Sequence, residues 1–371
     1  MQHKNREGRL RRMGRAGAGL LALVLAACAA TPFDAEAAKK KARNVRKARV
    51  PEAPAYGQRD DVMRFSAELA ERNGWPLDWV QAQLGQARYI ASVARLIMPP
   101  PVGTAKNWTA YHDRFIEPQR IGAGVQFWSD NAQALAQAEV RYGVPAAIVV
   151  GIVGVETFYG RITGTFRVLD TLATLSFDFP TGRSDRAPFF RSELEQFLQM
   201  CRREQRDCAS FKGSYAGAMG LPQFMPSSIN EYAVDFDQDG HIDLLGSPAD
   251  VVGSVAHFLA EKGWEPGLPT HYEVAPPADI QEREFLLGPD IVPRFTVAEF
   301  EKRGAALPEA ARQHPGLLAL VELQNGDAPP TTIAGTQNFY AVTRYNWSAY
   351  YAMAVIELGQ AVQQARANSV P

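Results

Sequence analysis

Apolar residues recur every three or four positions in segments 60–98 and 129–142, as they do on a helix with one buried face. The same spacing returns near the end of the chain and predicts a helix at Ser348–Ala365. The positions that carry the first two patterns are Val62, Phe65, Leu69, Val80, Leu84, Ala132, Leu135, Ala136 and Val140. With no internal repeat visible, we expect one mostly helical (α+β) body.

The pattern changes between 271 and 345, where short extended pieces replace the helical spacing. Strands are predicted at Tyr272–Val274, Phe285–Leu287 and Leu317–Leu323, and Asn325-Gly326-Asp327 is typical of a hairpin turn. The expected order is a helical core at about 144–270, a small β excursion at about 271–335 and a returning helix at about 336–366.

Glu156 closes the apolar run Ala146–Val155. Pro145 suits the first turn of a helix and Gly160 suits the residue just past its end, so Glu156 is predicted in the last turn. Apolar burial and the negative end of the helix dipole would both raise the pKa of its carboxyl group, as a general acid requires. The alternative is a surface glutamate that ends an ordinary buried helix.

The chain of 371 residues opens with a basic segment, followed by the apolar stretch Ala16–Ala27, which is too short to span a membrane. This predicts an export signal over residues 1–27. It ends in Leu25-Ala26-Ala27-Cys28, a lipobox whose cysteine receives lipid, and Ala29 favours the outer membrane. The alternative is a plain secretory signal and a soluble periplasmic protein.

Residues 28–58 are rich in Ala, Lys and Arg and predict a flexible tether, so the folded body spans 59–371. From residue 60 onward, 25 basic side chains face 36 acidic ones, a net of −11. This acidic body argues against nucleic-acid binding. The basic tether suits an anionic lipid surface or cell-wall polymer, or serves only as a solvated spacer.

Two further cysteines, Cys201 and Cys208, are separated by a polar hexapeptide. Export permits a disulfide between them, and the absence of a second cysteine pair or nearby histidine in the sequence argues against zinc.

A glycine-rich loop, 213–228, carries the polar residues Ser214 and Gln223 among apolar ones. Such mixed surfaces bind sugars, although its glycines also suit tight packing between helices. The segment 338–353 is dense in aromatic and amide side chains, which suits either a carbohydrate cleft or the docking of the last helix.

The segment 235–243 matches the first half of an EF-hand calcium loop. Asp235, Asp237 and Asp239 occupy positions 1, 3 and 5, Gly240 takes position 6, and the carbonyl of His241 follows. Position 12 is Gly246 instead of glutamate, so Asp243 or Asp250 would complete the site. We expect a structural Ca²⁺ here; the alternative is an acidic turn without an ion.

The stretches around Glu156, Phe189–Leu194, 214–228 and 338–355 together resemble the membrane-bound lytic murein transglycosylase B family, over roughly residues 60–365. The resemblance implies a lysozyme-like core with an additional helical lobe and a small β lobe. It also implies cleavage of the MurNAc-β-1,4-GlcNAc bond of peptidoglycan, giving 1,6-anhydro ends in cell-wall turnover without an organic cofactor.

The resemblance places the catalytic residue at Glu156, acting as acid and then as base. It assigns calcium ligands to Asp235, Asp237, Asp239, His241 and Asp250. A departure occurs at His257, where relatives carry tyrosine. The implied substrate contacts are Tyr111, Ser214, Gln223, Tyr345, Asn346, Tyr351 and, near the stem peptide, Arg186.

Expected partners are peptidoglycan strands, a membrane through the lipid anchor, and cell-wall synthesis or division proteins. Two alternatives remain: a scaffold lipoprotein that binds glycan without cutting it, and a hydrolytic lysozyme. The lysozyme requires a second carboxylate or a held water opposite Glu156, and Asp170 and Asp178 are the nearest candidate acids in sequence.

Overall fold

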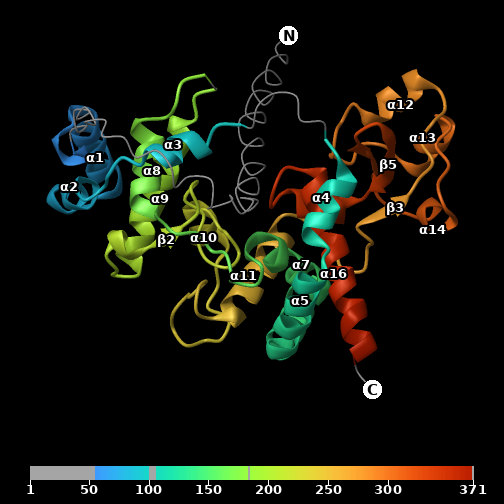
Figure 1. Cartoon of the computed structure of the whole chain (residues 1–371), viewed down its shortest axis with the longest axis horizontal. Helices are drawn as coiled ribbons and strands as arrows, with labels where there is room; N and C mark the ends of the chain where they lie inside the picture. The colour runs from blue at the N-terminus through green and yellow to red at the C-terminus, as the bar shows by residue number, and fades with distance from the viewer. Residues whose placement is uncertain (1–54, 100–105, 183, 370–371) are drawn as a thin grey trace, which may run out of the picture. The chain divides into compact units, whose positions relative to one another are not determined.

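The computed structural model of the protein describes residues 55–99, 106–182 and 184–369 (Figure 1). The predicted signal peptide, Cys28 and most of the predicted tether lie outside the described residues. The chain forms two compact units. We call 55–99 with 156–254 the helical unit, and 106–155 with 255–369 the helix–sheet unit.

The helical unit is built mainly from two packed helices, α8 and α9, to which the 55–96 segment is attached. The guanidinium of Arg59 donates to both carboxylate oxygens of Asp178 at 2.8 Å, and the Tyr56 hydroxyl donates to the same group at 2.6 Å. The elements of this unit are η3 (Tyr56–Gln58), α1 (Asp60–Asn73), α2 (Leu77–Gly85), α3 (Ala91–Leu96), β1 (Phe166–Arg167), α8 (Val168–Phe177), α9 (Ala187–Arg203), η4 (Cys208–Ser210), β2 (Lys212–Gly213), α10 (Pro226–Tyr232) and the first half of α11 (Pro248–Glu261).

The helix–sheet unit combines long helices with a three-stranded antiparallel sheet of order β3-β5-β4. A compact apolar cluster that includes Leu286, Phe300, Leu318 and Leu320 lies within the sheet region. The elements are α4 (Trp108–Phe115), α5 (Pro118–Asp130), α6 (Ala132–Tyr142), α7 (Ala146–Thr157), β3 (His271–Glu273), α12 (Ile280–Leu287), α13 (Val297–Lys302), α14 (Glu309–Arg312), β4 (Ala319–Asn325), β5 (Ala328–Gly335), α15 (Gln337–Thr343) and α16 (Ala349–Ser369).

Two predicted strands and the hairpin turn are found as β3, β4 and the turn that leads into β5, but the strand predicted at Phe285–Leu287 is wrong. This segment ends helix α12, which the Asp279 side chain starts by accepting from the backbone N–H groups of Gln281 and Glu282. An N-cap of this kind outweighs the weak β preference of a single phenylalanine.

The helices α7 and α16 approach each other closely enough to exclude side chains at two positions. A Cβ atom on Gly151 would lie 2.1 Å from the carbonyl oxygen of Val355, and one on Gly359 would lie 2.1 Å from that of Ala147. These glycines therefore fix how α7 lies against α16.

Among the helices of the described residues, none is by itself long and apolar enough to span a membrane. The pair α6 and α7 meets that test by length and composition when joined, with a bend of 117° between them.

Candidate active site and calcium loop

Glu156 lies in the last turn of α7 and is only 5% exposed. The helix ends at Thr157, and the next three residues, Phe158, Tyr159 and Gly160, all have left-handed backbones with φ of 51°, 55° and 88°. The helix thus ends two residues before the position that Gly160 suggested. For Phe158 and Tyr159 this conformation is strained, and strain of this kind gathers at functional sites.

The turn after Glu156 is fastened to the glycine-rich loop. The Thr157 hydroxyl donates to the carbonyl of Leu221 at 2.9 Å and accepts from the Gly160 N–H at 3.1 Å. A Cβ atom on Gly160 would reach Leu221 at 3.4 Å, so the two segments are in direct contact. The structure therefore joins two motifs that lie about sixty residues apart in the sequence.

The glycines of this loop serve close packing, as the alternative interpretation expected. A Cβ atom on Gly213 would lie 2.2 Å from the carbonyl oxygen of Ala218, and one on Gly217 would lie 2.6 Å from Leu172. Gly217 also has φ of 88°, which a side chain would strain. The loop is thereby held against α8.

Ser214 and Gln223, the predicted contact residues of this loop, are buried and partly engaged in it. The Ser214 hydroxyl accepts from the N–H groups of Ala216 and Ala218. The Gln223 amide nitrogen donates to the carbonyls of Thr163 and Gly220, and its backbone is left-handed with φ of 50°. Both of these side-chain hydrogen bonds of Gln223 are thus made by its amide nitrogen.

The predicted aromatic contacts gather in the helix–sheet unit. Tyr345 and Tyr351 are buried and stack at 6.2 Å with an interplanar angle of 14°. Asn346, between them in sequence, is 2% exposed, and its Oδ1 atom has no hydrogen-bond partner among the residues that the structure covers. Tyr111 on α4 is half-buried and lies 6.0 Å from the ring of Tyr350.

Two more positions were singled out from the sequence. Arg186 is half-buried and precedes the first residue of α9. His257 lies on α11, with its ring 5.5 Å from that of Tyr142 and its Nε2 atom 3.8 Å from a Glu261 oxygen. His257 therefore packs beside Tyr142.

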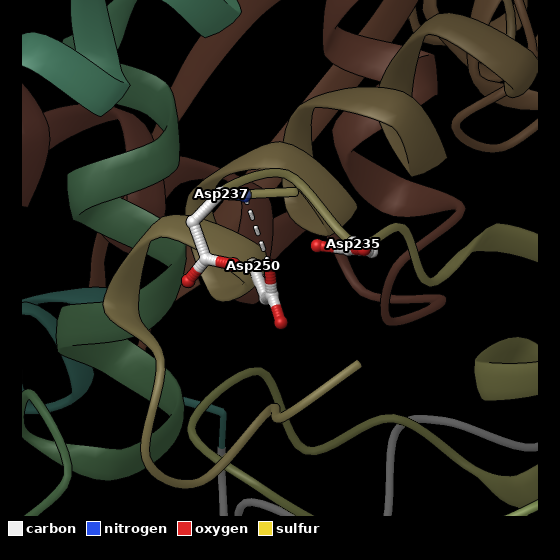
Figure 2. Close-up of side chains that lie close together, drawn as sticks. All are labelled: Asp235, Asp237 and Asp250. Carbon is white, nitrogen blue, oxygen red and sulfur yellow. Dashed lines mark hydrogen bonds between the residues drawn. The ribbon is translucent and has the colours of Figure 1, made fainter. Parts of the chain in front are cut away.

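The predicted calcium loop brings three carboxylates together (Figure 2). One oxygen each of Asp235, Asp237 and Asp250 lie within 4.8 Å of one another. The Asp239 carboxylate is not part of this cluster, since it accepts from the backbone N–H of His241 at 2.8 Å. Gly240 has φ of 92°, the sharp turn expected at the sixth position.

The fit to Ca²⁺ is good on chemical grounds. The donors are all hard oxygens, and their spacing allows contact with one ion at about 2.3–2.6 Å. Backbone N–H groups orient the acids: the Asp250 carboxylate accepts from Phe236 at 2.7 Å and from Asp243 at 2.8 Å. Asp250 thus lies beside Asp235 and Asp237, although position 12 of the loop carries no glutamate.

Comparison with known proteins decides the family. Residues 57–360 match the family described as the transglycosylase SLT domain. The chain belongs to this family. It is 40% identical over 319 residues to the membrane-bound lytic murein transglycosylase B of Escherichia coli (strain K12), covering 84% of this chain and 85% of that protein.

Solved structures agree with this membership. The soluble lytic transglycosylase SltB1 from Pseudomonas aeruginosa matches with a TM-score of 0.75 and 40% identity, over 83% of this chain and 99% of that one. The Escherichia coli transglycosylase Slt35, solved in complex with calcium, matches with a TM-score of 0.71 and 39% identity, over 84% and 95%. SltB3 from Pseudomonas aeruginosa, in complex with NAG-anhNAM-pentapeptide, matches with a TM-score of 0.68 and 27% identity, over 82% and 79%.

These matches confirm the predicted family, the mostly helical lysozyme-like fold and the predicted class of lytic transglycosylase acting on peptidoglycan. Two further carboxylates, Asp170 and Asp178, bear on how this transglycosylase cleaves. Asp178 binds Arg59 and Tyr56, as described above. Asp170 accepts from the Arg88 N–H at 3.0 Å and pairs with Arg167 at 3.2 Å, while burial raises the pKa of its carboxyl group. Both acids thus hold the helical unit together.

Glu193 is a buried carboxylate that the sequence interpretation missed. It lies on α9, is 3% exposed, and accepts from the backbone N–H of Ser227 at 3.0 Å and from its hydroxyl at 2.7 Å. It therefore ties α9 to the first turn of α10, which follows the glycine-rich loop. The signal was present in the sequence, because Glu193 falls between Phe190 and Phe197 on the apolar face of α9.

The stability of the transglycosylase should depend on pH because Glu193 is buried. Burial raises the pKa of Glu193, although its hydrogen bonds to Ser227 lower it. The pKa of Glu193 is higher in the folded state than in the unfolded state. Its contribution to the free energy of unfolding is therefore fully present below the unfolded pKa and is lost as pH rises through the folded pKa. We expect the stability advantage of the wild type over Glu193→Gln, measured by urea unfolding, to be smaller at pH 7 than at pH 4. An advantage that grew with pH would show that the Ser227 hydrogen bonds dominate instead.

Cys201 and Cys208 are free and buried in the structure, so the predicted disulfide is not formed in it. Their side chains are hydrogen-bonded to each other, and burial together with this contact raises the pKa of the Cys201 thiol. A neutral thiol pair satisfies the site without a covalent bond. Oxidation of the pair after export stays a prediction, which titration of free thiols in the unfolded protein would test.

Proposed function

We propose that Glu156 is the one carboxylate with which this transglycosylase cleaves the MurNAc-β-1,4-GlcNAc bond, first as acid and then as base. The observation that carries the proposal is its position. The carboxyl group is 5% exposed at the end of an apolar helix, and a strained turn beside it is fastened to the loop that holds Ser214 and Gln223. The proposed reaction starts from the protonated form of this carboxyl group.

In this mechanism Glu156 donates its proton to the glycosidic oxygen as the bond from that oxygen to C1 of the muramic acid breaks. The C6 hydroxyl of the same sugar then bonds to C1 and returns its proton to the Glu156 carboxylate. One product gains a hydroxyl group at its new end, the other carries a 1,6-anhydro ring, and the acid is regenerated without water. General acid catalysis of this kind contributes about 10²- to 10⁴-fold to the rate.

Polar and aromatic side chains predicted from the sequence are proposed to orient the sugar. Asn346 Oδ1 is a buried acceptor without a partner among the described residues, and it suits an N–H or O–H donor of a substituted sugar. The Gln223 side chain is proposed to hydrogen-bond a substituent of the sugar. The Ser214 hydroxyl, already accepting two N–H groups, is placed to donate its own proton. Tyr111, Tyr345 and Tyr351 are proposed as further substrate contacts, and Arg186 is proposed to approach the stem peptide.

A hydrolytic lysozyme is less well supported, because an additional carboxylate would have to hold a water molecule or attack the sugar. Asp170, Asp178 and Glu193 are engaged with arginine, tyrosine or serine partners in the helical unit. A scaffold that binds glycan without cleavage would not require a buried acid.

Turbidity clearing of purified sacculi, together with an assay for new reducing sugar ends, distinguishes the transglycosylase, the lysozyme and the scaffold. We expect clearing without new reducing ends. Clearing with reducing ends would indicate a lysozyme, and binding without clearing would indicate a scaffold.

We further propose a structural Ca²⁺ held by Asp235, Asp237 and Asp250, with the carbonyl of His241 and with Asp239 as a more distant acid. Support comes from the oxygen cluster and from the calcium complex of Slt35, a relative at 39% identity. When bound, the ion would neutralise clustered negative charge and join the start of α11 to the loop before it. It takes no part in bond cleavage.

Removal of calcium should lower the melting temperature more than it lowers intrinsic turnover. At a calcium concentration about 100-fold above Kd, the ion stabilises by about 2.7 kcal/mol, which corresponds to roughly 5–10 °C. Differential scanning fluorimetry with and without EGTA measures this shift. The Asp235→Asn/Asp237→Asn variant should not respond to EGTA, whereas the exposed-site control Asp327→Asn should respond like the wild type. An unchanged wild-type melting temperature in EGTA would exclude the site.

We also propose that the mature protein is a lipoprotein anchored through Cys28 on the periplasmic side of the outer membrane. The lipobox supports this, as does the similarity to a relative named as membrane-bound. Metabolic labelling with a fatty acid, and its loss in Cys28→Ala, would test the anchor. Secretion of an unlabelled wild-type protein would contradict it.

A further inference from the structure

The helical unit contains a pocket whose lining residues do not include Glu156. Its volume is about 660 Å³, and it lies between α2 and the segment that follows the end of α9. The lining side chains are Trp79, Gln83, Gln86, Cys201, Arg202, Gln205, Arg206 and Asp207. Two arginines and three glutamines thus share one pocket.

Both arginines are held by aromatic rings and not by acids. The Arg202 guanidinium lies 5.0 Å from the ring centre of Trp79, and the Arg206 guanidinium lies 4.4 Å from that of Phe211. Within the described residues neither forms an ion pair, whereas the adjacent Arg203 pairs with Glu204 at 2.8 Å. The two guanidinium groups share one pocket in a body with a net charge of −11, and a bound carboxylate would neutralise them.

The other polar groups of the pocket suit an amide chain. The Gln83 Oε1 atom is buried and accepts no hydrogen bond from any residue that the structure describes, which is costly unless a ligand or water donates to it. The one acid in the wall, Asp207, is already engaged, since its carboxylate accepts from the Ala209 N–H at 3.0 Å. The pocket therefore offers an acceptor, amide donors and two positive charges.

The end of α9 works against an anion, because the C-terminus of a helix carries partial negative charge. The two full positive charges of Arg202 and Arg206 outweigh it. Guanidinium groups bind carboxylates with two parallel hydrogen bonds, and glutamine amides pair with peptide amides. The matching ligand is a short peptide with free carboxylates.

We propose that this pocket binds the carboxylate-bearing peptide stem of a peptidoglycan strand. The choice of ligand rests on the proposed function, because peptide stems are the carboxylate-bearing peptides of the substrate, and the relative SltB3 is known in complex with a glycan pentapeptide. The pocket would hold the enzyme on a peptide-bearing strand without taking part in bond cleavage.

The test uses the free tetrapeptide L-Ala-γ-D-Glu-meso-diaminopimelate-D-Ala, titrated calorimetrically into the full protein carrying Glu156→Gln. We expect binding that weakens at least tenfold in Arg202→Gln/Arg206→Gln and weakens with added salt. The matched control is Arg366→Gln, which removes an arginine that lies 5.3 Å from the ring of Trp128, outside the pocket, and should bind normally. Equal binding by the double variant and the control, or no binding by any form at millimolar peptide, would overturn the proposal.

Gln83→Leu supplies a second readout in case the double variant folds poorly. Removing a buried acceptor that lacks a partner should leave the melting temperature unchanged or raise it, while peptide binding weakens. Unchanged binding would again overturn the proposal. Because no turnover is measured, this experiment can fail while cleavage succeeds. Absence of anhydro products, in turn, would contradict the proposed function without affecting the measured peptide affinity.

Discussion

Replacement of Glu156 by glutamine should reduce glycan cleavage by about 10³-fold or more while the protein stays folded. Glutamine has nearly the shape of glutamic acid but cannot donate a proton to the glycosidic oxygen or accept one from the C6 hydroxyl. Because both proton transfers use the same group, no other carboxylate takes over half of the reaction. The measurement is the initial rate of muropeptide release from purified sacculi.

The control for this variant is Glu357→Gln, which removes a half-buried carboxyl group that lies 3.2 Å from His112 Nε2 and whose pKa is raised by burial. It should retain nearly wild-type turnover, which separates loss of the catalytic acid from loss of a buried charge. The melting temperature of Glu156→Gln should stay close to that of the wild type, since glutamine has nearly the shape and volume of glutamic acid. Turnover within tenfold of the wild type by the folded variant would contradict the assignment.

Replacement of Gly151 by alanine should lower the free energy of unfolding by about 3 kcal/mol and the melting temperature by roughly 5 °C or more. The new methyl group would lie 2.1 Å from the carbonyl oxygen of Val355, which belongs to the backbone of α16 and cannot move aside alone. The two helices must separate or tilt. Since α7 carries Glu156, turnover should also fall in the fraction that remains folded.

Gly122 provides the matched control for this prediction. It lies within α5, and a Cβ atom there would meet nothing within 4 Å. Gly122→Ala should therefore be neutral or stabilise the protein by up to about 1 kcal/mol, because alanine favours helix more than glycine does. Thermal unfolding followed by circular dichroism compares the two. Equal stability of Gly151→Ala and Gly122→Ala would show that α7 and α16 are not packed as described.

The position of Glu156 could be predicted from its surroundings in the sequence, but the shape of the turn after it could not. An apolar run that starts after Pro145 and ends in an acid indicates a buried helix with a carboxyl group in its last turn, as found. The left-handed backbones of Phe158 and Tyr159 carry no local signal, since neither residue favours them. They are imposed by tertiary contacts such as that of Thr157 with Leu221.

For the predicted calcium loop, too, the sequence indicated only part of what the structure shows. The local spacing of Asp235 and Asp237 predicted the first half of the site, and Asp250 was one of two candidates for its closure. Asp239 stays a predicted ligand; its carboxylate accepts from the backbone N–H of His241 and lies outside the cluster of three acids. Which side chains converge depends on how the loop folds onto α11, and sequence spacing alone does not determine this.

Strand β5 was hard to predict because Pro329 and Pro330 stand at its start. Proline cannot donate to a sheet, and it is tolerated here since β3 pairs only with Ile333–Gly335 at the other end of the strand. The sequence thus indicated the lobe and its hairpin turn, while the exact strand lengths depended on pairing partners distant in the chain.

The most direct test of the central claim is the mass of the glycan ends released from sacculi in water enriched in ¹⁸O. If Glu156 transfers both protons and the muramic acid's own C6 hydroxyl closes the ring, each new muramic end will be lighter by one water than a hydrolytic end and will contain no ¹⁸O. New muramic ends that carry ¹⁸O would show that water attacks C1, and the account of Glu156 as sole acid and base would then be wrong.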